Sequence, residues 1–219
     1  MSVSYGVAMV DAARAGQVLR RASARKGKTY PVEILTPDEI RALAAECSKK
    51  SNYGIRHRAL IVVLYRTGMR ISEALALRPT DLNLEIGSVT VLHGKGDRRR
   101  TIGIDPGATP HIEAWLECRE TLHLPAAAPV FCTMKGTPMA ASSVSALFHK
   151  LAHRAGIEKR VHPHGLRHTH AYELMMEGIP MPIIQQQLGH ASLATTDRYL
   201  SHIAPKQVIE TMGNRVWSP

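Results

Sequence analysis

From residue 36 onward, apolar residues recur every three or four positions, the spacing that places them on one face of a helix. Thr36, Pro37 and Glu39 begin the first such segment with an N-cap, a favoured first helical residue and the acidic partner of a capping box. A second helix is predicted over residues 55–65, which have almost no polar position in their middle. We therefore expect this second helix to lie in the core.

Glycine and proline separate the helices that follow. Thr67-Gly68 interrupts the chain, and the next helical segment, which carries Arg70 and Glu73, cannot continue past Pro79. Asp105-Pro106 is expected to begin a later helix and Ser142 to cap another. The further helices are predicted over residues 105–122, 142–155, 165–176, 182–188, 194–200 and 205–212.

Between residues 88 and 104 the hydrophobic period changes from about 3.6 to two. Val89 and Val91 alternate with more polar positions, residues 94–97 contain the glycines of a turn, and residues 99–104 return as a second strand. Lys95 then lies at the tip of a β-hairpin. The predicted fold class is α+β, mainly α, with one small antiparallel sheet.

The first thirty residues have no sustained period and end in a basic stretch. Two interpretations have equal weight, a solvated tail or short helix, and an arm that lies along a DNA backbone. The candidate DNA-binding residues of this arm are Arg20, Arg21, Arg25, Lys26 and Lys28. We divide the chain into a basic arm, residues 1–34, and a compact domain, residues 35–219.

The charge balance favours a polyanionic partner, because 28 Lys and Arg residues face 18 Asp and Glu residues and the net charge is +10. The longest purely apolar run, residues 59–65, is far short of the ~20 residues that span a bilayer. No signal peptide pattern is present, so we expect a cytoplasmic, DNA-associated protein without a membrane partner. Three widely spaced cysteines support neither a disulfide framework nor a zinc site.

Two arginines, a lysine, two histidines and a tyrosine occur in a fixed order within short motifs. The motifs are Thr67-Gly68-Met69-Arg70-Ile71-Ser72-Glu73, His93-Gly94-Lys95-Gly96, His164-Gly165-Leu166-Arg167-His168, and Leu188-Gly189-His190 followed nine residues later by Tyr199. Two guanidinium groups can stabilise the charge of a phosphoryl transition state without a metal ion. The set is therefore sufficient to attack a phosphodiester and hold the product as a phosphotyrosine.

Each candidate has a chemical role in such a reaction. Tyr199 is a poor nucleophile at neutral pH, because the free pKa of tyrosine is about 10, and it needs a base. His164 is the candidate general base and acid, and His190 a hydrogen-bond donor to the phosphate. Lys95 can protonate the departing deoxyribose 5′-oxygen. Arg98 and Arg99, on the same hairpin, are further DNA-binding candidates.

Taken singly, these residues also have simpler explanations. Arg70 can pair with Glu73 one turn later, the two histidines can be capping or core-polar groups, and Tyr199 can be an amphipathic core residue. The coincidence of all of them in one order makes that interpretation weaker. A metal site is a second alternative, with His162, His164, His168 and His170 as the nearby ligands. No carboxylate or cysteine completes that set, so we expect no metal.

The ordered set of motifs resembles the tyrosine recombinase (phage integrase) family over residues 36–212. The resemblance implies the catalytic-domain fold of these DNA breaking-rejoining enzymes. It also implies that Arg70, Lys95, His164, Arg167 and His190 activate the phosphate and that Tyr199 attacks it, with no cofactor. Glu73 matches an acidic residue that orients an arginine. Residues 205–213 resemble a C-terminal helix that such proteins insert into a neighbouring protomer; alternatively, they can cover the chain's own core.

Only some thirty-five residues precede Thr36, whereas typical integrases carry a helical core-binding domain there. In this respect the chain resembles the minimal, fimbrial-invertase-like members. We expect a site-specific recombinase of double-stranded DNA that acts as a homo-oligomer, a tetramer on synapsed sites, with an accessory DNA-bending or directionality protein as a further partner. The alternatives are a relaxing activity of the type IB topoisomerase kind and a non-catalytic DNA-binding accessory protein of the same fold.

Overall fold

The computed structural model of the chain describes residues 33–92, 99–189 and 213. Helix α2 (Pro37–Ala45) begins as predicted, with Thr36 as its N-cap. The Thr36 hydroxyl accepts a hydrogen bond from the Glu39 backbone N at 3.2 Å, and the Glu39 carboxylate accepts one from the Thr36 backbone N at 2.7 Å. This reciprocal pair is the capping box expected from the sequence. Ile40 and Leu43 of α2 are buried.

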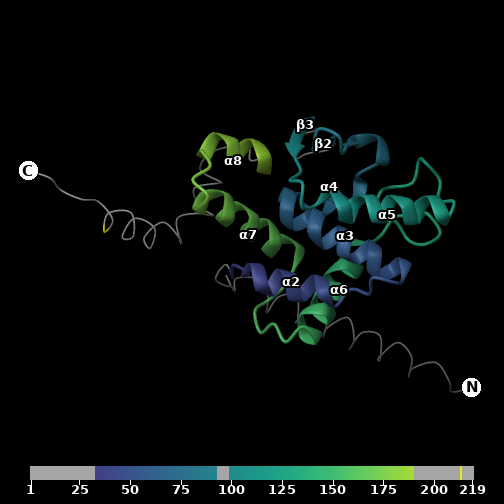
Figure 1. Cartoon of the computed structure of the whole chain (residues 1–219), viewed down its shortest axis with the longest axis horizontal. Helices are drawn as coiled ribbons and strands as arrows, with labels where there is room; N and C mark the ends of the chain where they lie inside the picture. The colour runs from purple at the N-terminus through teal and green to yellow at the C-terminus, as the bar shows by residue number, and fades with distance from the viewer. Residues whose placement is uncertain (1–32, 93–98, 190–212, 214–219) are drawn as a thin grey trace, which may run out of the picture. The chain divides into compact units, whose positions relative to one another are not determined.

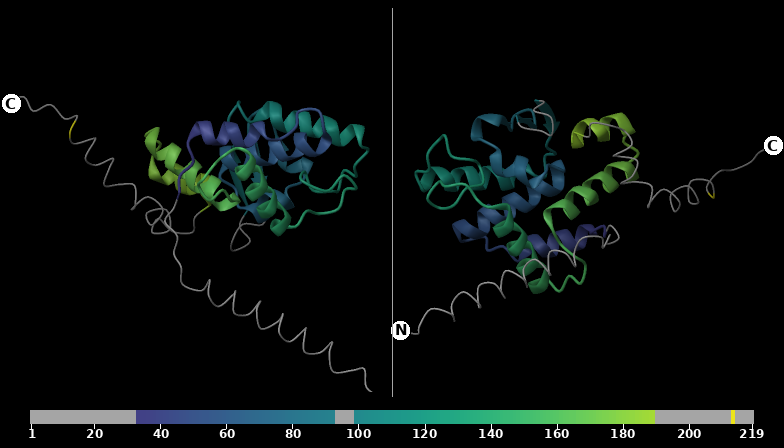
Figure 2. Two further views of the ribbon diagram at one scale, coloured as in Figure 1. Left: turned by 90° about the horizontal axis from the view of Figure 1, so that it is seen from below. Right: turned by 180° about the vertical axis from the view of Figure 1, so that it is seen from behind.

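Helix α3 (Asn52–Thr67) occupies the centre of the fold, as expected. It begins earlier than predicted because Ser51 caps it, accepting a hydrogen bond from the Gly54 backbone N at 3.1 Å. Helices α5 (Thr109–Thr121) and α7 (Pro163–Met176) pack against α3 from different sides, as the views in Figures 1 and 2 show. This packing brings the middle of α7 close to the end of α3, where Tyr65 donates a hydrogen bond to Glu173 and Arg167 donates one to the Gly68 carbonyl oxygen.

A three-stranded antiparallel sheet in the order β1-β2-β3 lies beside the helices. Strands β2 (Ser88–Val91) and β3 (Arg100–Gly103) form the predicted hairpin, in which Val89 pairs with Ile102. The turn that carries Lys95 lies outside the described residues. Strand β1 (Leu82–Asn83) was not predicted; it is only two residues long, too short to show a hydrophobic period.

Two further helices begin at residues other than those predicted. Helix α5 begins only at Thr109, because Asp105 lies in a turn that precedes the helix. The Asp105 carboxylate accepts a hydrogen bond from the Gly107 backbone N at 2.9 Å and forms an ion pair with Arg66. Helix α6 (Ala141–Arg154) has Ala140 as its N-cap, and Ser142 lies inside its first turn. The helices predicted over residues 194–200 and 205–212 lie outside the described part of the chain.

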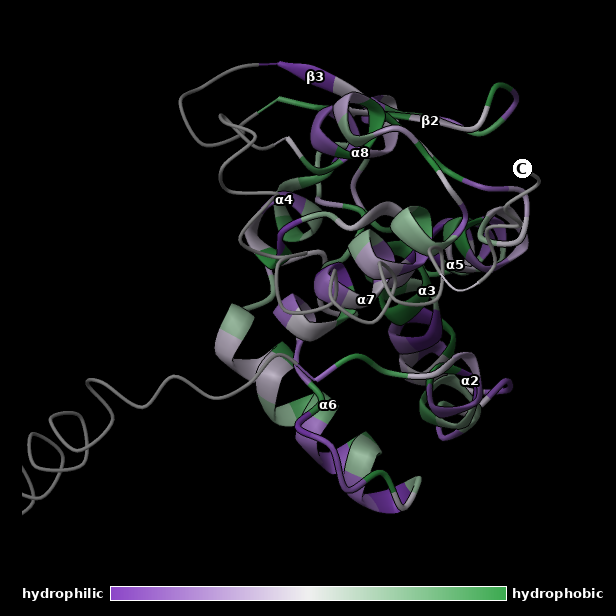
Figure 3. Ribbon diagram, turned by 90° about the vertical axis from the view of Figure 1, so that its left-hand side faces the viewer, coloured by the Kyte–Doolittle hydropathy of each residue, from purple (hydrophilic) through white to green (hydrophobic). Residues whose placement is uncertain are grey.

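Three short elements complete the arrangement, namely α4 (Ile71–Ala76), the 3₁₀ helix η1 (Pro79–Asp81) and α8 (Met181–Leu188). Helix α8 packs against both α7 and β3. Hydrophobic and hydrophilic positions alternate along α6, as Figure 3 shows, and its apolar residues join the same core as those of α3 and α5. Within the described ranges, no helix is long and apolar enough to cross a membrane.

Candidate active site

The turn between α3 and α4 places Arg70 at the N-cap of α4. Gly68 makes this turn with a positive φ of 62°, a conformation that glycine adopts without strain. A Cβ at this position would lie 2.7 Å from side-chain carbons of both His170 and Leu188. The glycine is therefore required both for the backbone conformation and for the close approach of α7 and α8.

Glu73 holds Arg70 in place through both its carboxylate oxygens. The Arg70 backbone N donates to Oε2 at 2.9 Å, and its Nη1 donates to Oε1 at 2.8 Å. The Glu73 side chain is 1% exposed, whereas that of Arg70 is 28% exposed. The ion pair of Arg70 with Glu73 is present, and it leaves the Arg70 guanidinium partly open to solvent.

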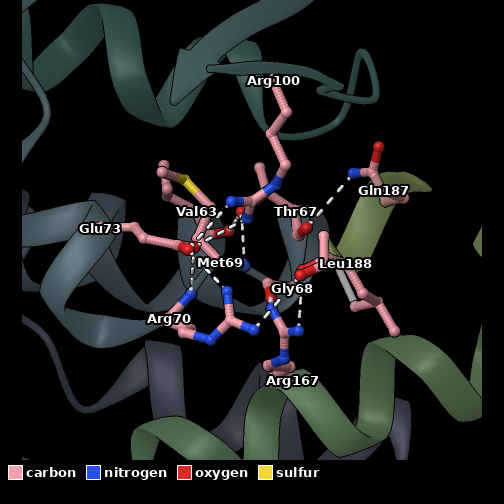
Figure 4. Close-up of polar contacts among 11 residues, drawn as sticks. Val63, Thr67, Gly68, Met69, Arg70, Glu73, Arg100, Arg167, Gln187 and Leu188 are labelled. Carbon is pink, nitrogen blue, oxygen red and sulfur yellow. Dashed lines mark hydrogen bonds and ion pairs between the residues drawn. The ribbon is translucent and has the colours of Figure 1, made fainter. Parts of the chain in front are cut away.

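Arg100, on β3, is a second arginine on Glu73 that the sequence analysis missed. Its Nη1 donates to Oε1 at 2.9 Å and its Nη2 to Oε2 at 2.8 Å, a bidentate pair drawn in Figure 4. A signal was present, because Arg100 precedes the buried Ile102 by two positions. Alternation along a strand places both side chains on the inward face, where an arginine needs an acidic partner.

The two arginines determine the ionisation of Glu73. Burial alone would raise the pKa of its carboxyl group, but the hydrogen bonds from Arg100 and Arg70, together with the positive charge of Arg100, lower that pKa to about 2. Glu73 is therefore a carboxylate at any physiological pH.

Arg167, on the first turns of α7, is buried and connects the C-terminal ends of α3 and α8. Each of these two helices ends at a glycine in the left-handed conformation, Gly68 and Gly189 respectively. The Arg167 Nη1 donates to the Gly68 carbonyl oxygen at 2.6 Å, and its Nη2 donates to the Leu188 carbonyl oxygen at 2.7 Å. Its side chain is 1% exposed. Arg70 contacts the same junction, since its Nη2 donates to the Gly189 carbonyl oxygen at 3.3 Å. The structure thus brings Arg70 and Arg167 together around the end of α8.

His164 lies one turn before His168 on α7, and the two rings meet edge to face at 4.5 Å between centroids. Partial burial lowers the pKa of His164, and the nearby positive charges of Arg167, His162 and Arg70 lower it further. The neutral imidazole is therefore favoured at neutral pH, and this form can accept a proton.

Gln187 ties α8 to the edge of the sheet. Its side-chain amide accepts a hydrogen bond from the Gly103 backbone N at 2.9 Å, and donates to the Gly103 and Thr67 carbonyl oxygens at 3.0 and 3.2 Å. These contacts fix the end of α8 against both β3 and the end of α3. The sequence contained no motif that identified this residue.

The remaining candidates are only partly placed. Arg99 is described, and it is exposed. The candidates outside the described residues are Arg20, Arg21, Arg25, Lys26, Lys28, Lys95, Arg98, His190 and Tyr199.

Comparison with known proteins shows the family and the fold to which the chain is similar. The model of the phage integrase family matches residues 33–205. A tyrosine recombinase XerC of Pelobacter propionicus is 34% identical over 79% of this chain, and a tyrosine recombinase XerD of Bifidobacterium longum is 33% identical over 86% of it. The chain spans 56% and 64% of the lengths of these two relatives.

Solved structures show the same fold. The crystal structure of XerA recombinase superimposes with a TM-score of 0.75 at 29% identity, and covers 87% of this chain and 68% of its own. A crystal structure of XerH site-specific recombinase bound to palindromic difH substrate gives a TM-score of 0.70 at 27% identity, and covers 87% of this chain and 55% of its own. The predicted fold, the catalytic-domain fold of tyrosine recombinases, is confirmed.

Proposed function

The chain belongs to the phage integrase family, and from that premise we propose that it is a site-specific recombinase that cuts and rejoins DNA through a phosphotyrosine. The observation that carries the proposal is the junction of α4, α7 and α8. There Arg70 donates to the Gly189 carbonyl oxygen, Arg167 donates to that of Leu188, and Glu73 fixes Arg70. A family relative, XerH, has been crystallised on its difH substrate, which supports double-stranded DNA as the partner.

The arginines supply the positive charge for the reaction. The partly exposed guanidinium of Arg70 is the first contact for the scissile phosphate. Arg167 holds the backbone at both ends of the junction and adds a second positive charge behind it. Preorganised charges of this kind stabilise the charge that develops on the non-bridging oxygens of a phosphoryl transition state.

The covalent step begins at Tyr199, whose hydroxyl oxygen attacks phosphorus and transfers its proton to neutral His164. The bond from phosphorus to the 5′-oxygen breaks, and Lys95 gives that oxygen a proton. The products are a 3′-phosphotyrosine and a free 5′-hydroxyl, while His190 donates a hydrogen bond to the phosphate. Rejoining reverses the step with the 5′-hydroxyl of the partner strand, so no external energy source is consumed.

The assembly follows from this chemistry. Exchange needs two DNA sites and four cut strands, so we propose a homotetramer on synapsed sites, with an accessory DNA-bending or directionality protein as a further partner. Residues 1–34 are the proposed DNA-binding arm, and residues 35–219 the catalytic domain. Residues 205–213 are the proposed element for exchange between protomers. We place the activity on DNA in the bacterial cytoplasm.

The test is to trap the covalent intermediate on a suicide substrate, a duplex nicked beside the cleavage point so that the cut strand diffuses away. The target is first identified by sequencing the fragments of a genomic DNA pool that the folded protein binds. We expect an adduct that survives denaturation and forms equally well in EDTA, because arginines rather than a metal ion stabilise the phosphate. Absence of adduct on every recovered sequence would refute the proposal, and restoration by magnesium after EDTA would refute this mechanism.

A second prediction concerns the basic arm. Changing Arg20, Arg21, Arg25, Lys26 and Lys28 together to Ala should weaken binding to all DNA sequences alike. The slope of the logarithm of the binding constant against the logarithm of salt concentration is negative, and its magnitude should fall by up to about 0.9 for each phosphate that the arm no longer neutralises. Binding is measured by fluorescence anisotropy at several salt concentrations, and an unchanged slope would favour the solvated tail.

A further inference from the structure

Arg100 and Arg70 compete for the same carboxylate. Glu73 receives two hydrogen bonds from the Arg100 guanidinium and one from the Arg70 guanidinium, in addition to the Arg70 backbone N. Bidentate pairing of guanidinium and carboxylate is the stronger geometry. Arg100 therefore makes the stronger interaction with the Glu73 carboxylate, and the Arg70 guanidinium makes only one hydrogen bond with Glu73.

The charges at this site do not cancel. Two guanidinium groups carry two positive charges, and Glu73 carries one negative charge. With Arg100 in place, the carboxylate is already neutralised, and the charge of Arg70 remains to act on a phosphate. Without Arg100, Glu73 and Arg70 would form a closed neutral pair, and Arg70 would have to break that pair to bind a phosphate.

The position of Arg100 argues against direct contact with DNA. Its side chain is 13% exposed, and both terminal nitrogens already bind Glu73. Its Nε lies against Gly189, where an added Cβ would come within 2.5 Å of that nitrogen. Arg100 thus packs between Glu73 and the end of α8.

We propose that Arg100 is a positioning residue, which neutralises Glu73 so that Arg70 remains available to the scissile phosphate. This inference rests on the proposed function. Arg100, on the hairpin that carries Lys95, is connected to Arg70 through the buried carboxylate of Glu73. Arg100 itself does not touch the reacting atoms.

The test is a double-mutant cycle on the full chain, with the single-turnover rate of adduct formation on a suicide substrate as the readout. Arg100→Met removes the charge and keeps the length of the side chain, and should slow cleavage by about tenfold, a smaller loss than that of a direct transition-state donor. Arg100→Lys restores the charge and should recover most of the rate. In the Glu73→Gln background, the neutral amide no longer traps Arg70, so Arg100→Met should then cost less than about twofold.

Controls separate the possible failures. Arg41→Met removes an exposed arginine that pairs with Asp38, and should leave the rate unchanged. Thermal unfolding reports whether each variant is folded. The inference is overturned if Arg100→Met slows cleavage by the same factor with Glu73 and with the Glu73→Gln change. It is also overturned if Arg100→Met reduces the magnitude of the salt slope of binding by about 0.9, as removal of a phosphate-binding cation would. If the unsubstituted protein forms no adduct, the proposed function fails first and the inference fails with it.

Discussion

Tyr199→Phe should abolish the covalent adduct while DNA binding and thermal stability persist. The substitution removes one oxygen atom and keeps the ring, so the packing of the side chain changes little. No phosphotyrosine can form without that oxygen, because the phenolic oxygen is the atom that bonds to phosphorus. The measurement is denaturing gel electrophoresis of the protein after incubation with a labelled suicide substrate, together with a binding titration of the same sample.

Tyr172→Phe is the matched control, since Tyr172 lies on α7 and is partly buried. It should form adduct at the rate of the unsubstituted protein. If Tyr199→Phe still formed normal adduct and Tyr172→Phe did not, the nucleophile would be Tyr172. The proposed role of Tyr199 would then be wrong, although the family assignment would stand.

Elements with complete local signals were predictable from the sequence. Helix α2 is the best example, because the Thr36 and Glu39 side chains accept hydrogen bonds from backbone N–H groups at its start, and Pro37 has no N–H that needs a partner. The hairpin of β2 and β3 was predicted in the same way from alternation. The existence of helix α5 was predicted, but its start was not, because Asp105, where the helix was expected to begin, interacts with Arg66, which lies 39 positions earlier in the chain. Such a contact is decided by tertiary packing and leaves no trace in the local pattern.

The same distinction applies to the site. Arg70 and Glu73 are three residues apart at a helix start, so their pairing follows from the sequence. The contact of Arg100 with Glu73 joins residues 27 positions apart, and depends on how the sheet packs against α4. The contacts of Arg167 with two backbone carbonyls depend on three helices at once. Residue type and order therefore indicated the chemistry, whereas the support of each group required the fold.

Arg167→Lys should slow cleavage by about a hundredfold or more, by analogy with the loss of one preorganised transition-state donor. Lysine keeps the positive charge but lacks the planar fork that reaches Gly68 and Leu188 together. One of these buried carbonyls would lose its partner, which costs about 1–3 kcal/mol of stability. DNA affinity should change far less, since one charge among many is moved rather than removed. Single-turnover cleavage, chemical denaturation and a binding titration measure the three effects.

Arg154→Lys is the control, because it makes the same chemical change at a position outside the proposed active site. There Arg154 forms an ion pair with Glu46 on a half-exposed surface. The substitution should leave cleavage, stability and binding nearly unchanged. The rate for Arg167→Lys is read at a temperature well below its unfolding midpoint, so that a fraction of unfolded protein cannot account for a hundredfold loss. A variant that is destabilised but cleaves at the normal rate would show that Arg167 only supports the junction. The positive charge required by the transition state would then come from Arg70 and from groups outside α7.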